Sequence, residues 1–195
     1  MGEKSAQKRQ LILERARDVF IEKGFKNVTM KDIVEACEIS RGGLYLYFEN
    51  TNDVFMEVLK LEQEDTDDSL EAVLSEESTV ADILTLFLNE QKREILKKDD
   101  TLTIATYEFF FVNKFSKKDH IMRKKFELGV KLISEIITAG VATGEFYCEN
   151  PLVMAMNIMF VLEGLKISAK TIGISEKTVD EQLLYLLDGL LIEEE

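Results

Sequence analysis

The chain has 195 residues, of which 46% are hydrophobic and one is proline, and its formal net charge is −13. Many Leu, Glu, Lys and Ala residues with almost no proline favour an all-helical protein, and no apolar run reaches the roughly 18 residues of a membrane span. The first residues lack the apolar core of a secretory signal, and Cys37 and Cys148 lie far apart without metal-ligand spacing. We therefore expect a reduced, cytoplasmic protein with no membrane span, metal or other cofactor.

Charge is unevenly distributed along the chain. Residues 1–60 hold ten Lys/Arg and ten Asp/Glu, whereas residues 61–195 hold fourteen Lys/Arg and twenty-seven Asp/Glu. An early basic cluster of Lys4, Lys8 and Arg9 opens the neutral part. Because net charge acts on solubility and steering rather than on what one face binds, the overall acidity does not exclude a nucleic-acid partner.

Four helices are predicted in the first 71 residues, and local signals mark where they start or stop. Thr29 followed by Asp32 is a variant capping box, in which two side chains satisfy free N–H groups at a helix start. A glycine at position 24 ends the helix before it. The predicted helices are residues 5–23, a short helix after Thr29, Ser40 to Phe48, and a long helix from Asn50 through the acidic stretch 62–71.

Five more helices are predicted in the rest of the chain. Asn150 before Pro151 places a cap before a proline at the first helical position, where the missing N–H costs nothing. The five run from Thr79 to about Leu96, over 101–115, over 119–143, from Asn150 to about Lys170, and onward from Ser175. With no strand-like alternation or sequence repeat, the predicted fold class is all-α with about nine helices.

Residues 29–48 have the spacing of a helix-turn-helix, two short helices joined by a tight turn. The second of these helices carries the stretch SRGGLYLYF, residues 40–48. Leu44 and Phe48 lie four residues apart and share the predicted buried face. The margins of that face carry Arg41, Tyr45 and Tyr47, and Gly42 lies well away from it.

Two adjacent glycines in the first turn should each cost about 1 kcal/mol relative to alanine. Small residues there let the backbone and the positive end of the helix approach an anion. Arg41 can reach a base edge or a phosphate, and the phenols can donate to phosphate oxygens. These features predict that the helix enters a DNA major groove. The alternative is that the glycine pair only eases close helix packing.

Residues 8–55 resemble the DNA-binding domain of the TetR/AcrR family of one-component transcriptional regulators. The resemblance is carried by ILERARDVFIEKGFKNVTMKDIVEACEISRGGLYLYFENTNDVF, and less specifically by the later AGVATGEF and VLEGL. It implies an all-α homodimer, usually a repressor, released from operator DNA when a small molecule binds the C-terminal domain. On this basis residues 1–50 are predicted to bind DNA, and residues 51–195 to bind an effector and to dimerise.

The resemblance also implies which residues touch DNA. Phosphate or groove contacts are expected from the second helix, direct contacts from the recognition helix, and backbone contacts from Lys8 and Arg9 as an N-terminal arm. Ser40 has the alternative role of a helix cap. The implied DNA-binding residues are Thr29, Lys31, Ser40, Arg41, Gly42, Gly43, Tyr45, Tyr47 and Thr51.

Two positions depart from the pattern of the family. Many members carry glycine where this chain has Glu38, so we expect a strained or altered backbone in the turn. Many also carry a phosphate-binding lysine where this chain has Thr51, which weakens the electrostatic attraction to DNA. We expect the backbone amides near Asn50 and Thr51 to bind a phosphate instead.

Aromatic and methionine residues are dense in the segments 101–115 and 154–160. Such side chains adapt to lipophilic ligands, so we predict a pliable pocket for a lipophilic small-molecule effector. Ordinary hydrophobic core is the alternative for each residue. Glu108 and Glu163 lie within these apolar segments, and a cationic effector would be favoured if either of them faces the ligand. The predicted ligand-binding residues are Tyr107, Glu108, Phe111, Phe126, Met159 and Glu163.

The predicted helices over 151–170 and 176–192 are apolar on all sides, which a monomer surface does not favour. Burying them in a four-helix bundle between two copies gives a homodimer. Two-fold symmetry would set the recognition helices roughly 34 Å or more apart and match a palindromic operator.

Two alternatives belong to other classes of protein. An enzyme is not expected, because the only histidine, His120, stands in the charged stretch KKDHIMRKK, and no nucleophile elbow, phosphate loop or dinucleotide fingerprint occurs. A helical adaptor with degenerate DNA binding is the second alternative, supported by the acidic charge, Glu38 and Thr51. Salt-dependent retention on DNA separates an adaptor from a regulator.

Overall fold

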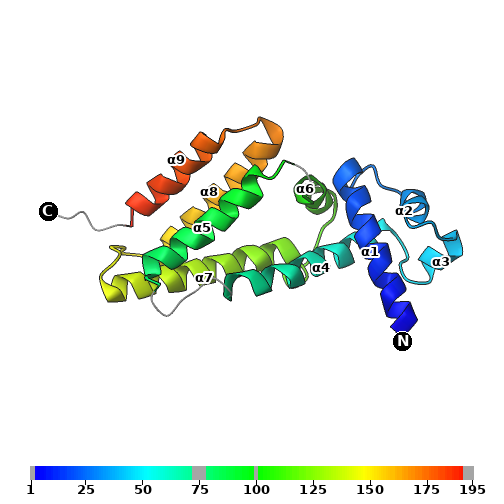
Figure 1. Ribbon diagram of the computed structural model, residues 1–195, viewed down its shortest axis with the longest axis horizontal. Coiled ribbons are helices and arrows are strands. Elements are labelled where there is room, and N and C mark those ends of the chain that lie inside the picture. Colours follow the sequence, from blue (N-terminus) through cyan, green and yellow to red (C-terminus); the bar gives the residue numbers. More distant parts are fainter. Residues whose placement is uncertain (1–2, 72–77, 99–100, 191–195) are drawn as a thin grey trace. The chain divides into compact units, whose positions relative to one another are not determined.

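The computed structural model describes residues 3–71, 78–98 and 101–190, and these form nine α-helices and no β-strand (Figure 1). The all-α fold predicted from the sequence is confirmed. The helices are α1 (Glu3–Lys23), α2 (Met30–Ala36), α3 (Arg41–Tyr45), α4 (Thr51–Glu71), α5 (Val80–Leu96), α6 (Thr103–Val112), α7 (Ile121–Thr143), α8 (Pro151–Thr171) and α9 (Glu176–Asp188).

The predicted helix starts coincide with the observed caps. The Thr29 hydroxyl accepts a hydrogen bond from the Asp32 N–H at 3.3 Å, and the Asp32 carboxylate accepts one from the Thr29 N–H at 2.7 Å. Thr79 and Asp82 form the same reciprocal pair at the start of α5. Single side-chain caps open the other four predicted starts, at Ser40, Asn50, Asn150 and Ser175.

Two helices are shorter than predicted. α3 ends at Tyr45, because the Tyr47 and Phe48 N–H groups both turn back to the Leu44 carbonyl, at 2.9 and 3.2 Å. α6 ends at Val112, because Asn113 takes an extended conformation and its side-chain amide donates to the Phe109 carbonyl at 3.1 Å. In both cases a local turn competes with continuation of the helix.

The chain divides into two compact units. Unit 1 contains α1 to α4 and α6, and unit 2 contains α5, α7, α8 and α9. α6 therefore packs with the helix-turn-helix, although α5 precedes it in the sequence. The functional roles assigned to residues 1–50 and 51–195 remain predictions.

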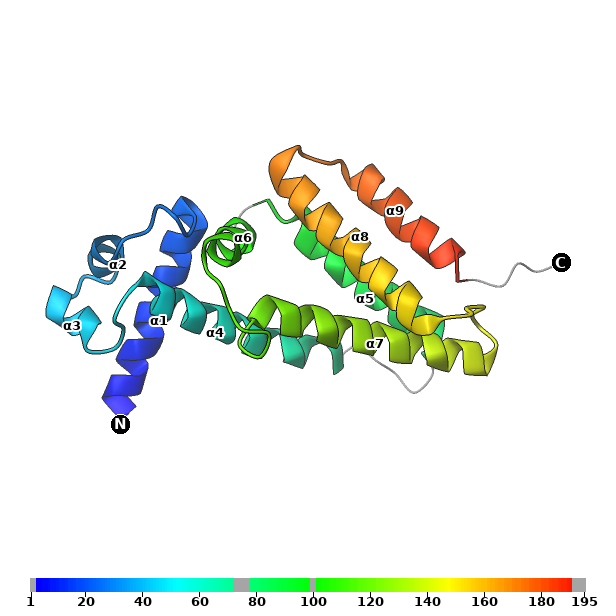
Figure 2. The same ribbon diagram turned by 180° about the vertical axis from the view of Figure 1, so that it is seen from behind.

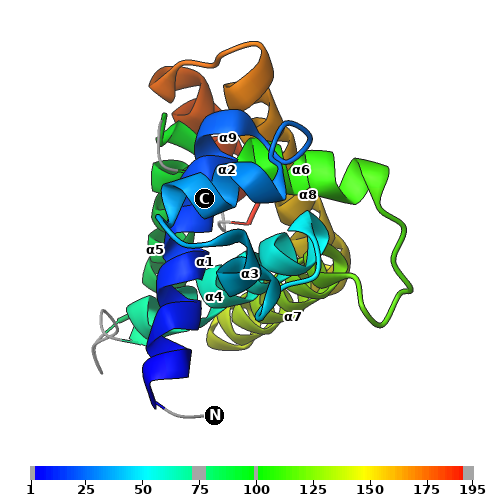
Figure 3. The ribbon, with the colours of Figure 1, turned by 90° about the vertical axis from the view of Figure 1, so that its right-hand side faces the viewer.

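An aromatic cluster forms the centre of unit 1. Phe109 of α6 lies with its ring centroid 4.8 Å from that of Phe25 and 5.0 Å from that of Phe55, and Phe20 of α1 lies 4.6 Å from Phe55. All four rings are buried. Burial of each ring contributes about 1.5–3 kcal/mol, and each good edge-to-face pair adds about 0.5–1.5 kcal/mol. This cluster holds α6, α1 and α4 together behind α2 and α3, which lie nearer the viewer in Figure 3.

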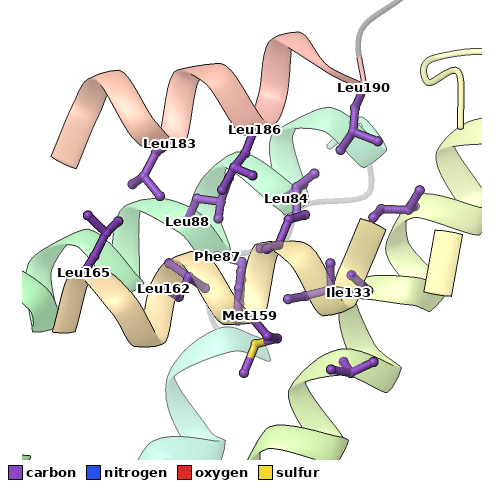
Figure 4. Packing of buried hydrophobic residues seen from close by; sticks show 14 of the residues in the cluster. Leu84, Phe87, Leu88, Ile133, Met159, Leu162, Leu165, Leu183, Leu186 and Leu190 are labelled. Carbon is purple, nitrogen blue, oxygen red and sulfur yellow. The ribbon is translucent and has the colours of Figure 1, made fainter. Parts of the chain in front are cut away.

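Leucines dominate the core of unit 2. Leu183, Leu186 and Leu190 point from α9 and its end toward Leu84 and Leu88 of α5 (Figure 4). α8 and α9 run antiparallel to each other, and α8 also packs against α5 and α7 (Figure 2). The Lys92 ammonium of α5 adds ion pairs to α9, 2.8 Å from Glu176 and 2.5 Å from Asp180.

In the part of the chain that the structure describes, α8 has the length and apolar composition to cross a membrane. A single such helix is weak evidence, because core helices of soluble proteins meet the same criteria. One side of α8 is buried in unit 2, through Ala155, Ile158, Leu162 and Leu165. Packing in the core of unit 2 therefore explains the apolar residues on the buried side of α8.

Candidate nucleic-acid interface

The helix-turn-helix is held by the residues that the sequence predicts to be buried. Ile33 of α2, Leu44 of α3 and Phe48 are at most 3% exposed, and Cys37 closes the end of α2 with its thiol 4.0 Å from the Ile12 carbonyl. With this face packed on α1, the opposite face of α3 is left to solvent (Figure 3).

The turn contains Glu38 in the left-handed region, with φ of 53°. The strained backbone expected for a non-glycine residue is therefore observed, in the left-handed conformation that glycine favours. The turn is closed by the Glu38 N–H, which donates to the Glu35 carbonyl at 3.2 Å, and by the Ile39 N–H, which donates to the Val34 carbonyl at 3.3 Å. A non-glycine residue in this conformation costs about 1–2 kcal/mol. The helix-turn-helix geometry is retained at that cost.

The exposed face of α3 carries an arginine stacked on a tyrosine. The Arg41 guanidinium carbon lies 5.6 Å from the centre of the Tyr45 ring, one helical turn away. Tyr45 is 42% exposed, so the ring supports Arg41 from the solvent side of the helix rather than from the core. A stacked guanidinium keeps its N–H edge free to donate while losing conformational freedom. A free guanidinium edge is the group that can pair with O6 and N7 of a guanine.

The two glycines of α3 have different surroundings. A side-chain carbon at Gly42 would meet no atom within 4 Å, whereas one at Gly43 would lie 3.2 Å from the Ser40 hydroxyl and 3.7 Å from the Lys8 ammonium. Packing within the protein therefore explains a small residue at position 43 only. At position 42 there is open space for a side chain, and the role of this glycine in close approach to DNA stays a prediction.

Several predicted DNA contacts also have partners inside the protein. The Ser40 hydroxyl accepts from the Gly43 N–H at 3.1 Å, and the Thr29 hydroxyl donates to the Asp32 carboxylate at 2.6 Å. The Tyr47 hydroxyl lies 3.3 Å from the Ser5 hydroxyl of α1. Lys31 is exposed and lies 3.6 Å from the Glu35 carboxylate. Capping and interhelical hydrogen bonds thus account for three of these polar groups without DNA.

The start of α2 is also tied to α1 by charge. The Lys23 ammonium lies 2.6 Å from the Asp32 carboxylate. Together with the hydroxyl and N–H of Thr29, this ammonium holds the pKa of Asp32 well below its usual range, and the carboxylate in turn raises the pKa of Lys23. The ionised form of Asp32 thus stabilises the start of α2 and its contact with the end of α1.

Lys8 and Arg9 lie within α1 rather than in an extended arm. The Arg9 guanidinium pairs with the Glu57 carboxylate of α4 and lies 5.3 Å from the centre of the Phe48 ring. Both residues lie in the helix that the sequence predicts over 5–23, and their contacts with the DNA backbone stay a prediction. Arg9 links α1 to α4, while Lys8 lies near the start of α3.

Thr51 is half-buried in the first turn of α4. The helix is capped by Asn50, whose side-chain oxygen accepts from the Asp53 N–H at 3.0 Å, and the Asp53 carboxylate accepts from the Glu49 N–H at 3.3 Å. A carboxylate in the first turn opposes a phosphate at the same helix end. The contact of Thr51 with a phosphate stays a prediction.

The predicted ligand-binding residues are divided between the two units, with three in α6 of unit 1 and three in α7 and α8 of unit 2. In α6, the ring of Tyr107 stacks on that of Phe111 at 6.3 Å, and Phe111 is 79% exposed. Glu108 fills the space over Gly24, and its carboxylate accepts from the Lys26 N–H at 3.1 Å.

In unit 2, the ring of Phe126 lies 5.1 Å from that of Phe160. Met159 is buried, and its terminal methyl would be 2.8 Å from a side-chain carbon at Gly129. Glu163 lies 3.4 Å from the Lys166 ammonium. Both glutamates that were predicted to attract a cation thus have positively polarised partners within their own unit.

The sequence prediction left out one residue of the α3 surface. Leu46 directly follows α3 and is exposed, although its neighbours Leu44 and Phe48 are buried. Its distance of two residues from each buried position is the signal in the sequence that places it on the opposite side.

An exposed recognition helix on an all-α scaffold, with a separate helical body, defines a helix-turn-helix transcriptional regulator. Residues 12–58 match the family of bacterial regulatory proteins of the tetR type, and residues 83–180 match the tetracyclin repressor-like C-terminal domain. The chain belongs to the TetR family.

Relatives and solved structures agree with this assignment. The HTH-type transcriptional regulator YfiR of Bacillus subtilis strain 168 is 33% identical over 142 residues, which cover 72% of this chain and 69% of YfiR. QacR of Staphylococcus aureus Mu50 is 36% identical over 52 residues, 27% of this chain and 28% of QacR. A TetR regulator from Haloarcula marismortui shares the fold with a TM-score of 0.83 at 17% identity, covering 96% of this chain and 100% of that one.

The protein is therefore a DNA-binding transcriptional regulator and not an enzyme. Regulators of this family bind operator DNA, form dimers and respond to small-molecule effectors.

Proposed function

We propose that this regulator is a cytoplasmic repressor that binds a palindromic operator as a homodimer and leaves it when a lipophilic effector binds. The observation that carries the DNA-binding part is the exposed side of α3, where Arg41 is stacked on Tyr45 beside a glycine that no protein atom approaches. Arg41 contributes specificity in this proposal. Tyr45, Tyr47 and Lys31 contribute mainly affinity.

Arg41→Ala tests the assignment of the interface. The operator is first selected from a pool of random duplexes, and binding is then measured by fluorescence anisotropy on the operator and on random DNA. Loss of a bidentate contact with guanine should cost about 1–3 kcal/mol on the operator and much less on random DNA. Lys131→Ala, which removes an exposed positive charge from α7, outside α3 and the proposed dimer surface, is the control and should bind normally.

Equal losses on both DNAs would show that Arg41 contacts phosphate only. If the wild-type chain shows no salt-dependent binding to any duplex, the alternative of a helical adaptor replaces the regulator.

The apolar outer sides of α8 and α9 support a homodimer through these helices. Seven large apolar side chains on the two helices are exposed in the single chain, namely Leu152, Val153, Met156, Phe160, Ile167, Leu184 and Tyr185. Large exposed apolar side chains gathered on two neighbouring helices are typical of an interaction surface. In a two-fold symmetric dimer, α8 and α9 of one copy would pack against α8 and α9 of the other. The four helices would then form a bundle that buries these side chains.

A lipophilic effector is proposed from the aromatic and methionine residues of the predicted set. The neighbouring rings of Phe126 and Phe160 and the adaptable thioether of Met159, all within unit 2, support it. The partners of Glu108 and Glu163 favour a neutral effector over a cationic one.

The test is thermodynamic linkage. Lipophilic compounds that raise the melting temperature of the protein are titrated with and without operator. Operator should weaken the effector by the same factor by which effector weakens operator, typically 5–150-fold. Equal affinity with and without operator would mean that the compound does not regulate DNA binding.

A further inference from the structure

Leu46 is the most exposed large apolar side chain in the described part of the chain, at 81%. It stands in the recognition segment between Tyr45 and Tyr47, in a region whose other large aliphatic side chain, Leu44, is fully buried. Packing within unit 1 therefore gives no reason for a leucine at this position.

The position of Leu46 on the helix follows from a backbone hydrogen bond. Its N–H donates to the Gly42 carbonyl at 3.2 Å, so the helical turn continues from Gly42 to Leu46. Residues four apart lie on the same side of a helix. Leu46 therefore lies on the same side of the helix as Gly42, where a side chain would meet no protein atom. Arg41 and Tyr45, which stack on each other, lie next to this side. The open space at Gly42 allows a duplex to come close enough for Leu46 to reach it.

The chemistry of the side chain restricts what it can contact on DNA. Leucine offers no hydrogen-bond donor to a phosphate and no acceptor to a base. The major groove has one apolar feature at its base edges, the C5 methyl group of thymine. Burying that methyl against the leucine removes apolar surface of both molecules from water.

We propose that Leu46 reads a thymine in each half-site of the operator through contact with its C5 methyl group. This inference rests on the proposed DNA interface on α3. It adds a second specificity determinant to Arg41, one that recognises a methyl group instead of a hydrogen-bonding edge.

The experiment replaces each thymine of the selected operator in turn with deoxyuridine, which removes only the methyl group. Binding is measured by fluorescence anisotropy for the full-length wild-type protein, for Leu46→Ala, and for Leu128→Ala, which truncates an exposed leucine of α7. At one thymine per half-site, uridine should weaken wild-type binding by about fourfold, the loss expected for one buried methyl group.

The two variants separate the cause. Leu46→Ala should bind the thymine operator more weakly than wild type does and should bind thymine and uridine operators equally well. Leu128→Ala should retain both the wild-type affinity and the sensitivity to uridine. The proposal is overturned if no thymine is sensitive to the substitution, or if Leu46→Ala keeps the full sensitivity.

Measuring Arg41→Ala on the same operator shows whether a negative result concerns Leu46 alone or the whole proposed DNA interface on α3. A loss of binding by Arg41→Ala together with full uridine sensitivity in Leu46→Ala would reject the role of Leu46 alone. No effect of either variant would reject the α3 interface itself, and the role of Leu46 with it.

Discussion

Single positions in α2, the turn and α3 show where the demands of folding and of DNA binding diverge. Gly43 is enclosed by Ser40 and Lys8, whereas Gly42 has open space where a side chain would be. Glu38 holds a left-handed conformation that favours glycine. The fold therefore does not require glycine at position 42. Position 38, in contrast, has a conformation that suits glycine better than the glutamate it carries.

Gly42→Ala should separate stability from function. Because no protein atom lies near, the methyl group should leave stability unchanged or raise it by up to about 1 kcal/mol through helix propensity. Operator affinity should fall by about tenfold or more, since the methyl group stands where the duplex approaches closely. Urea unfolding and anisotropy titration measure the two effects. Normal operator binding by this variant would refute close approach at Gly42.

Glu38→Gly should stabilise the protein. Removing the side chain relieves about 1–2 kcal/mol of left-handed strain, and the greater freedom of glycine in the unfolded chain offsets part of the gain. We expect a net increase of about 0.5–1 kcal/mol in the free energy of unfolding, measured with urea. Glu35→Gly, in the regular helix before the turn, should instead destabilise by about 1 kcal/mol. Equal effects of the two substitutions would contradict the strain at Glu38.

At the scale of the helices, α2 is positioned by its capping box and by the ion pair from α1. Lys23 and Thr29 both stabilise the ionised form of Asp32. A carboxylate whose pKa is depressed by folding contributes stability above its unfolded pKa, near 4, and this contribution is lost as the pH falls toward the folded pKa.

Asp32→Asn should therefore destabilise the protein in a pH-dependent way. Near pH 7 the loss should be on the order of 1 kcal/mol, the usual value of a capping interaction. The difference from wild type should begin to shrink between pH 4 and pH 3, because protonation of Asp32 in the unfolded wild-type chain lowers the free energy of that chain while the folded carboxylate is still ionised. Urea unfolding at several pH values measures this, with Asp18→Asn as a control for removing an acidic charge from α1. A difference that stays constant down to pH 3 would contradict the role of the carboxylate.

At the scale of the whole molecule, the outer apolar side chains of α8 and α9 are consistent with a symmetric dimer. The leucine pairs near the C-terminus divide between two surroundings. Leu183 and Leu186 are buried in unit 2 and Leu187 packs against that core, whereas Leu184 is 56% exposed. Of these, Leu184 reports on assembly with the least effect on the fold.

Leu184→Glu should produce monomers. Symmetry places the substitution twice in the interface, and losing two buried leucines should cost about 3–6 kcal/mol, or 10²–10⁴-fold in the dimer dissociation constant. Analytical ultracentrifugation at micromolar concentration measures this, and operator binding should fall with it. Leu128→Glu on α7, where the leucine is 64% exposed, should remain dimeric. A wild-type chain that sediments as a monomer would refute the dimer.

The sequence by itself determined the helical class, most of the helix starts and the regulator family. Capping depends on residues within about four positions of each other, so Thr29 with Asp32 and Thr79 with Asp82 could be read without a structure. The spacing from Thr29 to Phe48 is equally local. Arg41, Tyr45 and the glycines were predicted on the same basis, and their contacts with DNA remain predictions.

The tertiary structure decided which of these groups have partners elsewhere in the chain. It pairs Tyr47 with Ser5 and Arg9 with Glu57, places Phe109 in the core of unit 1, and leaves Leu46 exposed. The pairings join residues more than 40 positions apart, which no local pattern encodes. The spacing of Leu46 from Leu44 and Phe48 indicates which side of the helix it lies on, but how far it is exposed depends on which distant helices cover that side.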